Sequence, residues 1–195
     1  PRLDYSGSCP ALLLEPQRNN KMYQSEYLRV GSGATGAFDW KNTYVTLTSN
    51  DATSPDGYVN ATKMDTTSAN GSADSYVGYT ASSTNTMSLF VKAGTSSSFD
   101  LLHIATGGTA QVTFDLDNGT FTRRDELDSA ATITDYGNGW WRVTMTYTAG
   151  TGVYISRLRV NDVGYVHIWG WQIEEASYPT SYIPTYGSSV TRSGD

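Results

Sequence analysis

Two segments in the C-terminal half of the chain combine indole rings with polar side chains that could bind a ligand. GNGWWRVTMTY spans residues 137–147, and GYVHIWGWQIE spans residues 164–174. Flat apolar rings stack on the C–H faces of sugars, while nearby amides, carboxylates or guanidinium groups hydrogen-bond the hydroxyls. These residue types therefore favour a carbohydrate-binding surface built on the two segments.

Strand alternation places the two tryptophans of the first segment on opposite faces of the strand. Successive strand side chains point to opposite faces, so Trp141 joins the apolar set with Val143, whereas Trp140 joins the polar set with Arg142. We therefore expect Trp140 to face the surface, unless a bulge at Gly139 shifts the register.

The second segment carries apolar residues on both faces, which is typical of a central strand. Alternation places Val166 and Ile168 on one face and both Trp169 and Trp171 on the other. The candidate ligand-binding set, for a glycan or a partner protein, is Trp140, Trp171, Arg142, Gln172 and Glu174. Large aromatics in sandwiches are most often core residues, and Trp40, Trp141 and Trp169 are expected to pack inside.

The sequence contains no strong pattern of catalytic residues. Cleavage of a glycosidic bond would need two positioned carboxylates, and seven are candidates in the strands and turns. These are Asp115, Asp117, Asp125, Glu126, Asp128, Glu174 and Glu175. Most of them fit turns or strand ends, so a polysaccharide depolymerase is the less favoured alternative and no catalytic residue is assigned.

Other cofactor and hydrolase motifs lack their context. GSGATG at residues 31–36 fits a dinucleotide-binding glycine pattern, but no helical sequence follows it, so we expect a loop. His103 and His167 stand far apart without a zinc or serine-hydrolase motif, and both are expected to be strand residues. No cofactor is predicted, and a structural Ca²⁺ cannot be placed from the sequence.

Charge and composition exclude several classes of partner. The 13 basic and 19 acidic residues give a net charge of −6, which disfavours nucleic acid and anionic membranes. The chain has no apolar run long enough to span a bilayer, so membrane insertion is not expected. The lone Cys9 has no partner for an internal disulfide, so we expect either a protein of a reducing compartment or one stabilised by its core or by oligomerisation.

The elements that would position these residues are β-strands. Hydrophobic residues make up 38% and charged residues 16%, with many Thr, Ser, Gly and Tyr, and only a turn or two around residues 19–28 could be helical. Short alternating segments recur from Thr43 onward, which predicts an all-β, two-sheet antiparallel jelly roll. We expect one domain over residues 1–195, with an irregular N-terminal strap (1–42), a sandwich (43–175) and an extended tail (176–195). The predicted inward sets are Met87, Leu89 and Val91, then Val112, Phe114 and Leu116, and then Trp141, Val143, Met145 and Tyr147.

Four phrases, in their order and spacing, resemble a carbohydrate-binding-like domain of tailed-bacteriophage virion proteins, such as tail fibres and capsid decoration proteins. They are PRLDYSGSCPALLLEPQRNN, GNGWWRVTMTY, HIWGWQIEEASYPTSYIPT and VTRSGD. The chain departs from the family at Asn19, where a Thr is common, and at Trp171, where a small residue is common. An indole that the family pattern does not explain is a better candidate for contact with a particular partner.

The resemblance implies a lectin-like sandwich used for adhesion or virion decoration, often as a module of a longer, frequently trimeric protein. It thus implies a virion appendage, or otherwise an extracellular or cell-surface location, and a homo-oligomer. The first hypothesis is a non-catalytic module that binds glycans. The alternative is a purely structural capsid or tail protein that binds only other virion proteins.

Overall fold

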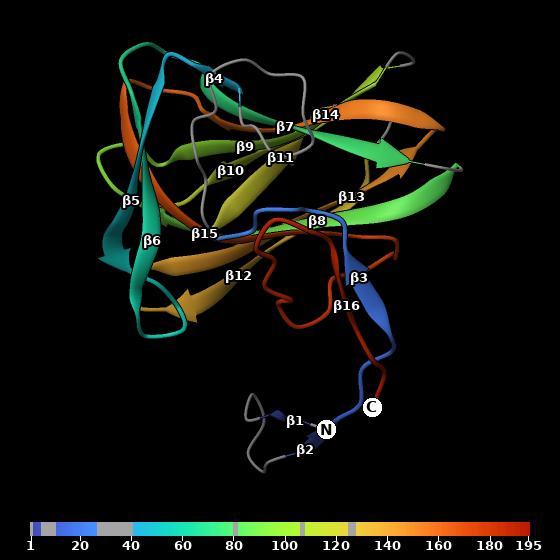
Figure 1. Ribbon diagram of the computed structural model, residues 1–195. Coiled ribbons are helices and arrows are strands. Elements are labelled where there is room, and N and C mark those ends of the chain that lie inside the picture. Colours follow the sequence, from blue (N-terminus) through green and yellow to red (C-terminus); the bar gives the residue numbers. More distant parts are fainter. Residues whose placement is uncertain (1, 5–10, 27–40, 80–81, 106–107, 125–127) are drawn as a thin grey trace.

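Alternating apolar residues along the middle of the chain form long antiparallel strands in the computed structural model. The structure describes residues 2–4, 11–26, 41–79, 82–105, 108–124 and 128–195. Two six-stranded sheets stack face to face (Figure 1). The predicted all-β jelly-roll sandwich is confirmed.

The strands divide between two large sheets and two small ribbons. Sheet I has the spatial order β11 (Thr120–Arg123), β10 (Gly108–Asp115), β9 (Ser98–Ala105), β14 (Gly152–Val160), β7 (Gly71–Tyr79) and β4 (Lys41–Thr43). Sheet II has the order β12 (Asp128–Gly137), β13 (Trp140–Ala149), β8 (Ser83–Ala93), β15 (Gly164–Glu174), β6 (Val59–Thr66) and β5 (Val45–Thr53). The ribbons pair β1 (Arg2–Asp4) with β2 (Ala11–Leu13) and β3 (Arg18–Asn20) with β16 (Val190–Arg192).

The main core lies between the two sheets, where alternate side chains of both inner faces meet. The predicted inward residues Met87, Leu89, Val91, Val112, Phe114, Leu116, Val143, Met145 and Tyr147 are all buried there. Trp141 is half-buried and packs against this core, and its Nε1 donates a hydrogen bond to the carbonyl of Leu116 at 2.9 Å. Period-two counting therefore predicted these inner faces correctly.

Strand β15 contains a bulge that sequence alternation did not show. Its pairing with β8 gains one residue between Trp169 and Gln172, and Gly170 has a φ of +67°. Glycine adopts this left-handed conformation without the steric cost that a Cβ brings. The extra residue reverses the alternation, so side chains after the bulge point to the faces opposite to those expected.

Segments from both ends of the chain cover sheet II. Residues 21–25 continue the edge of β15 beyond the bulge: Lys21 N donates to Ile173 O at 2.8 Å, and Trp171 N donates to Ser25 O at 3.0 Å. The C-terminal segment, residues 175–189, crosses the outer face of sheet II, the face that points away from sheet I. There the hydroxyl of Thr86 donates to Ala176 O at 2.9 Å. Figure 1 shows the two terminal segments side by side beneath β8.

The helical turn expected near residues 19–28 is absent from its described part, residues 19–26. The Asn20 side chain explains the difference, because it donates to Ile183 O at 2.8 Å and accepts from Ile173 N at 3.1 Å. These contacts fix the segment in an extended form against β15. Residues 27–28, the GSGATG loop at 31–36, Trp40 and Cys9 lie outside the described residues. Within the described ranges, the chain contains no helix of the length and apolar character needed to cross a membrane.

Candidate functional site

Trp171 lies in the main core, not on the outer face with Trp169. Because the bulge precedes it, Trp171 points between the sheets together with Ile173, and it is 0% exposed. The expectation that both indoles share a strand face is therefore wrong, and Gly170 is the physical reason. Contact between Trp171 and a ligand stays a prediction, but this structure gives the ring no exposed face.

Trp140 does point to the outer face of sheet II, as alternation predicted, but it is covered. Only 3% of it is exposed, and it packs with Phe90 and Trp169 in a second apolar cluster. Its Nε1 donates to the carbonyl of Thr53 at 3.1 Å, at the end of β5. The expected surface position is therefore wrong, because Phe90, Trp169 and the end of β5 pack against the ring.

Gln172 and Glu174 follow the bulge onto the outer face, where they fasten the C-terminal segment. Glu174 accepts hydrogen bonds from the backbone N of Thr180 at 2.8 Å and from the side chain of Gln172 at 2.6 Å. Gln172 in turn accepts from the backbone N of Ile183 at 2.7 Å. Their ligand-binding role stays a prediction. In this structure they position the segment that carries Ser181 and Tyr182.

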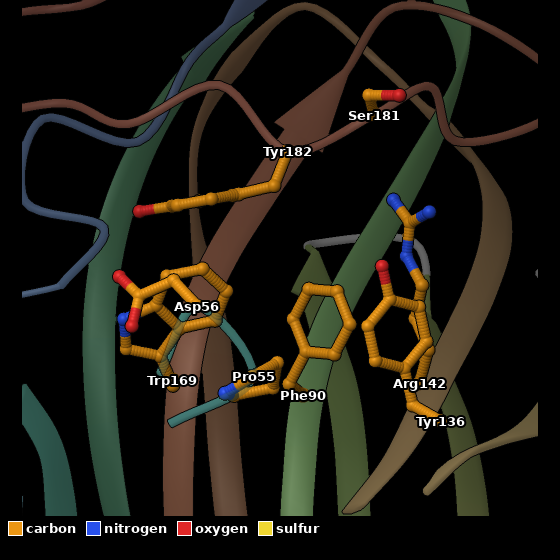
Figure 2. Close-up of a pocket in the computed structure, with 8 residues that line it drawn as sticks. All are labelled: Pro55, Asp56, Phe90, Tyr136, Arg142, Trp169, Ser181 and Tyr182. Carbon is orange, nitrogen blue, oxygen red and sulfur yellow. The ribbon is translucent and has the colours of Figure 1, made fainter. Parts of the chain in front are cut away.

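That segment and the outer face of sheet II enclose a pocket of about 270 Å³. We call it the aromatic pocket. Its lining residues are Pro55, Asp56, Phe90, Tyr136, Arg142, Trp169, Ser181 and Tyr182. Figure 2 shows the Tyr182 ring above Trp169, with Phe90 and Tyr136 beside them and the Arg142 guanidinium near Ser181. The volume is close to the lower end of small-molecule sites, about 300 Å³.

The four aromatic rings of the pocket pack on one another and form one aromatic surface. Ring centroids are 4.8 Å apart for Phe90 and Tyr136, 5.3 Å for Phe90 and Trp169, and 4.6 Å for Trp169 and Tyr182. Burial raises the pKa of the Tyr182 hydroxyl, which therefore stays protonated. The Nε1 of Trp169 is buried and has no hydrogen-bond partner among the described residues.

Arg142 of the predicted set does line the pocket. It lies opposite Phe90 in the β13–β8 pair, and its guanidinium carbon is 5.4 Å from that ring centroid, a cation–π distance. Nη2 donates to the carbonyl of Thr180, whereas Nε has no partner among the described residues. Burial lowers the pKa of this guanidinium, yet an arginine stays charged in proteins.

A loop between β5 and β6 forms the opposite wall. Asp56 holds this loop in shape by accepting hydrogen bonds from the Ser54 hydroxyl, from Tyr58 N at 2.9 Å and from the Asn60 amide at 3.0 Å. Burial raises the pKa of Asp56, but these hydrogen bonds outweigh it and hold the pKa below its ordinary value. The carboxylate thus serves the loop and stays ionised.

A second pocket of about 300 Å³ adjoins the first. It is lined by Thr53, Ser54, Pro55, Gly57, Lys92, Tyr136, Gly137, Asn138 and Trp140. Pro55 and Tyr136 line both pockets, so the two share a wall. The Lys92 ammonium donates to the carbonyl of Asn138 at 2.8 Å.

Of the residues predicted from the sequence to bind a ligand, Arg142 lines the aromatic pocket. Trp169 was predicted only as a packing residue, and three aromatic lining residues, Phe90, Tyr136 and Tyr182, were not predicted. Trp169 is buried as expected, yet it also lines the pocket. Phe90 could have been found, because it falls on the face opposite the inward set of β8. Tyr136 lies one residue before the end of β12, next to the turn at 138–139, and is 55% exposed, a weaker signal. No pattern in the sequence showed that the tail would bring Tyr182 to the same place.

His103 lies in β9 and His167 in β15, so both are strand residues, as expected. His167 is 2.8 Å from Asp51 through Nε2 and Oδ2. Over the described ranges, no group of three or more His, Cys, Asp or Glu side chains could hold a metal ion.

No protein-family model and no curated protein matches the sequence. Solved structures share its fold. A protein of Bacteroides thetaiotaomicron that was proposed to bind sugars aligns with 80% of this chain and 100% of its own, with 10% identity and a TM-score of 0.51. This likeness establishes the jelly-roll sandwich and does not identify a ligand.

Two further solved structures are larger chains, and this chain aligns with only part of each. The CBM22-1 and GH10 modules of Clostridium thermocellum endo-1,4-β-D-xylanase 10B, complexed with xylohexaose, align with 87% of this chain and 30% of that one, at 13% identity and a TM-score of 0.49. The enzymatically active domain of bacteriophage CBA120 tailspike protein 4 aligns with 76% of this chain and 22% of that one, at 13% identity and a TM-score of 0.42.

Proposed function

We propose that this chain is a non-catalytic glycan-binding module and that the aromatic pocket is its binding site. The observation that carries the proposal is the combination of four aromatic side chains with an arginine that keeps unused hydrogen-bond donors. Apolar rings bind the C–H faces of a sugar, and fixed polar groups set its orientation. The likeness to a protein proposed to bind sugars supports the same class of ligand.

The pocket supports binding rather than cleavage. Glycoside hydrolysis needs two carboxyl groups about 5 to 9.5 Å apart across the scissile bond. Among the described lining residues of the two pockets, Asp56 is the single carboxylate, and its oxygens serve the loop. Incubation with bacterial capsule or algal polysaccharide should therefore release no new reducing ends, and sustained release would contradict this part of the proposal.

A glycan array with the protein in multivalent form tests the binding. We expect Tyr136→Ala to weaken binding of the selected glycan about tenfold, because one stacking ring is lost. Tyr178→Ala is the matched control, since Tyr178 is 51% exposed, Tyr136 is 55% exposed, and Tyr178 does not line the pocket. Equal glycan affinities of the two variants would show that Tyr136 does not contribute to the binding site. A blank array at millimolar ligand would reject the proposal.

We further propose a place for this module on the surface of a virion, in several copies. The resemblance of the terminal phrases to phage virion domains supports this location, and multivalent display would raise weak single-site binding through effective concentration. Mass spectrometry of purified particles would detect the chain, and light scattering of the isolated protein would give its oligomeric state. Purified virions that lack the chain would refute the location. A strict monomer in solution would contradict self-association of the isolated protein as the source of the several copies.

A further inference from the structure

We propose that the aromatic pocket and the second pocket form one groove for an acidic oligosaccharide, in which Arg142 and Lys92 bind carboxylates on neighbouring sugar units. This inference deepens the proposed function and rests on it. It names the class of glycan, which contains uronic acids, and a minimum length of two units.

The two pockets adjoin each other along sheet II. They share Pro55 and Tyr136 as a common wall. Phe90 and Lys92 are alternate residues of β8 on the outer face, one in each pocket, and residues so placed lie about 6.6 Å apart along a strand. That separation is on the scale of one sugar ring. A linear glycan can therefore occupy both pockets with consecutive units.

Arg142 differs from three other arginines of the described chain in lacking an acidic partner. Arg157 pairs with Asp74, and Arg159 pairs with Asp100 in the same sheet. Arg192 likewise pairs with Glu15 at 2.9 Å. Arg142 forms no ion pair with any described residue and uses a single nitrogen, Nη2, in a hydrogen bond. A planar guanidinium with unused donors is suited to a carboxylate.

Lys92 shows the same feature in the second pocket. Lys21 pairs with Glu175 and Lys63 pairs with Asp65, whereas Lys92 has no ion-pair partner in the described ranges. Its one hydrogen bond goes to a backbone carbonyl. Lys92 faces Trp140 in the β8–β13 pair, so it lies diagonally from Arg142, and diagonal neighbours are about 7 to 8 Å apart. The groove thus carries two cationic side chains that form no ion pair with a described residue, on strand positions separated by about the length of one sugar unit.

Asp56 is the carboxylate among the described lining residues that opposes this arrangement, while Glu174 and Glu15 act electrostatically on Arg142 from outside the lining. Asp56 lines the aromatic pocket, but Figure 2 shows its carboxylate on the far side of Phe90 from the Arg142 guanidinium. Both of its oxygens accept hydrogen bonds from the loop. An acidic sugar can therefore direct its carboxylate towards Arg142 and its ring towards the wall that carries Asp56.

Titration calorimetry with defined probes tests the inference. The probes are tetragalacturonate and tetramannuronate, their methyl-esterified neutral counterparts, and the galacturonate monomer. We expect an acidic tetramer to bind at least about tenfold more tightly than its ester, since each carboxylate gains a charge-assisted bond. Lys92→Gln, which keeps a donor for the Asn138 carbonyl, should reduce tetramer affinity about fivefold to tenfold. It should reduce affinity for the monomer less than affinity for the tetramer, because a monomer can bind at Arg142 alone.

Lys63→Gln is the control, because Lys63 lies outside both pockets. Equal binding of acid and ester, or no binding of either acidic tetramer, would overturn the inference. An equal loss in the Lys92 and Lys63 variants, or a loss of monomer affinity in Lys92→Gln as large as the loss of tetramer affinity, would overturn the assignment of the second pocket. Neutral glycans that bind the array in a Tyr136-dependent way would still uphold the proposed function, whereas a blank array rejects both.

Discussion

Trp169 and Trp171 lie two positions apart on β15 but on opposite faces of sheet II. Trp171 fills the main core, whereas Trp169 packs with Phe90 and supports the ring of Tyr182 at the aromatic pocket. Trp171, one of the two residues that depart from the virion-domain pattern, is therefore a core residue. The difference between the two indoles comes from the single glycine between them.

His103 makes stability depend on pH in the acid range. It is 0% exposed and stacks on Tyr147 with ring centroids 4.2 Å apart, and burial lowers its pKa to about 4 from an ordinary 6.5. Between these values the unfolded chain binds a proton that the folded chain does not. The free energy of unfolding should therefore fall as the pH drops from 6.5 to 4, with about 3 kcal/mol from this residue.

Urea unfolding of the wild type and of His103→Phe across this range isolates the effect. The variant keeps a stacked ring but cannot titrate, and carboxylate contributions are common to both proteins. The free energy of unfolding of the wild type minus that of the variant should fall by about 3 kcal/mol as the pH drops from 6.5 to 4. A difference that stays constant from pH 6.5 to pH 4 would show that His103 does not titrate in this range.

At the scale of elements, the bulge in β15 builds the site. Before the bulge, Ile168 faces the core and Trp169 faces outward; after it, Ile173 faces the core while Gln172 and Glu174 face outward. Without the extra residue, Gln172 and Glu174 would point into the core. The bulge therefore allows one strand to supply both the aromatic floor of the pocket and the polar side chains that fasten the segment above it.

Gly170→Ala should weaken both the fold and the site. A Cβ there would lie 3.2 Å from Cδ2 of Phe90 and 3.4 Å from the Tyr182 ring, and the φ of +67° is itself unfavourable for alanine. We expect a loss of about 1 to 2 kcal/mol in the free energy of unfolding and weaker glycan binding. Gly187→Ala controls for the φ cost, since its φ is +94° and the nearest side-chain atom to its Cβ is at 3.9 Å. Unchanged glycan affinity in Gly170→Ala would show that the bulge is not needed for the binding site.

At the scale of the whole molecule, the two ends of the chain complete the sandwich. Residues 21–25 pair with β15, the C-terminal segment covers the outer face of β8 and β13, and β3 pairs with β16. Glu15, near the start, binds Arg192 and accepts from the backbone N of Ser181 at 2.6 Å. The aromatic pocket exists only when these distant segments have docked.

Glu174→Ala should release the C-terminal segment. The substitution leaves the backbone N of Thr180 and the amide of Gln172 without their acceptor. We expect a cost of about 2 to 4 kcal/mol, faster proteolysis after residue 175 and loss of glycan binding as Tyr182 moves. Glu175→Ala is the matched control, because this neighbour is 59% exposed at its side chain and pairs with Lys21, an interaction of about 1 kcal/mol or less. Equal effects of the two substitutions would contradict a fastening role for Glu174.

The sequence by itself determined the strands and the inner faces of the sandwich. Alternation in residues 87–91, 112–116 and 143–147 predicted buried sets that the structure confirms, because burial between two sheets imposes a period of two. It also placed Arg142 on the outer face, where the pocket lies.

Only the tertiary structure decided the candidate site. Alternation carries no signal for a bulge, so the sequence placed Trp171 beside Trp169, whereas the left-handed φ of Gly170 sends it into the core. Nor does a local pattern show which distant segment will cover an outer face. Trp140 is buried because Phe90, Trp169 and the end of β5 pack around it. Tyr182 reaches the pocket because hydrogen bonds from Thr180 and Ile183 dock the C-terminal segment on β15. Those bonds join residues that are adjacent in the fold, and strand periodicity reports only which way a side chain points.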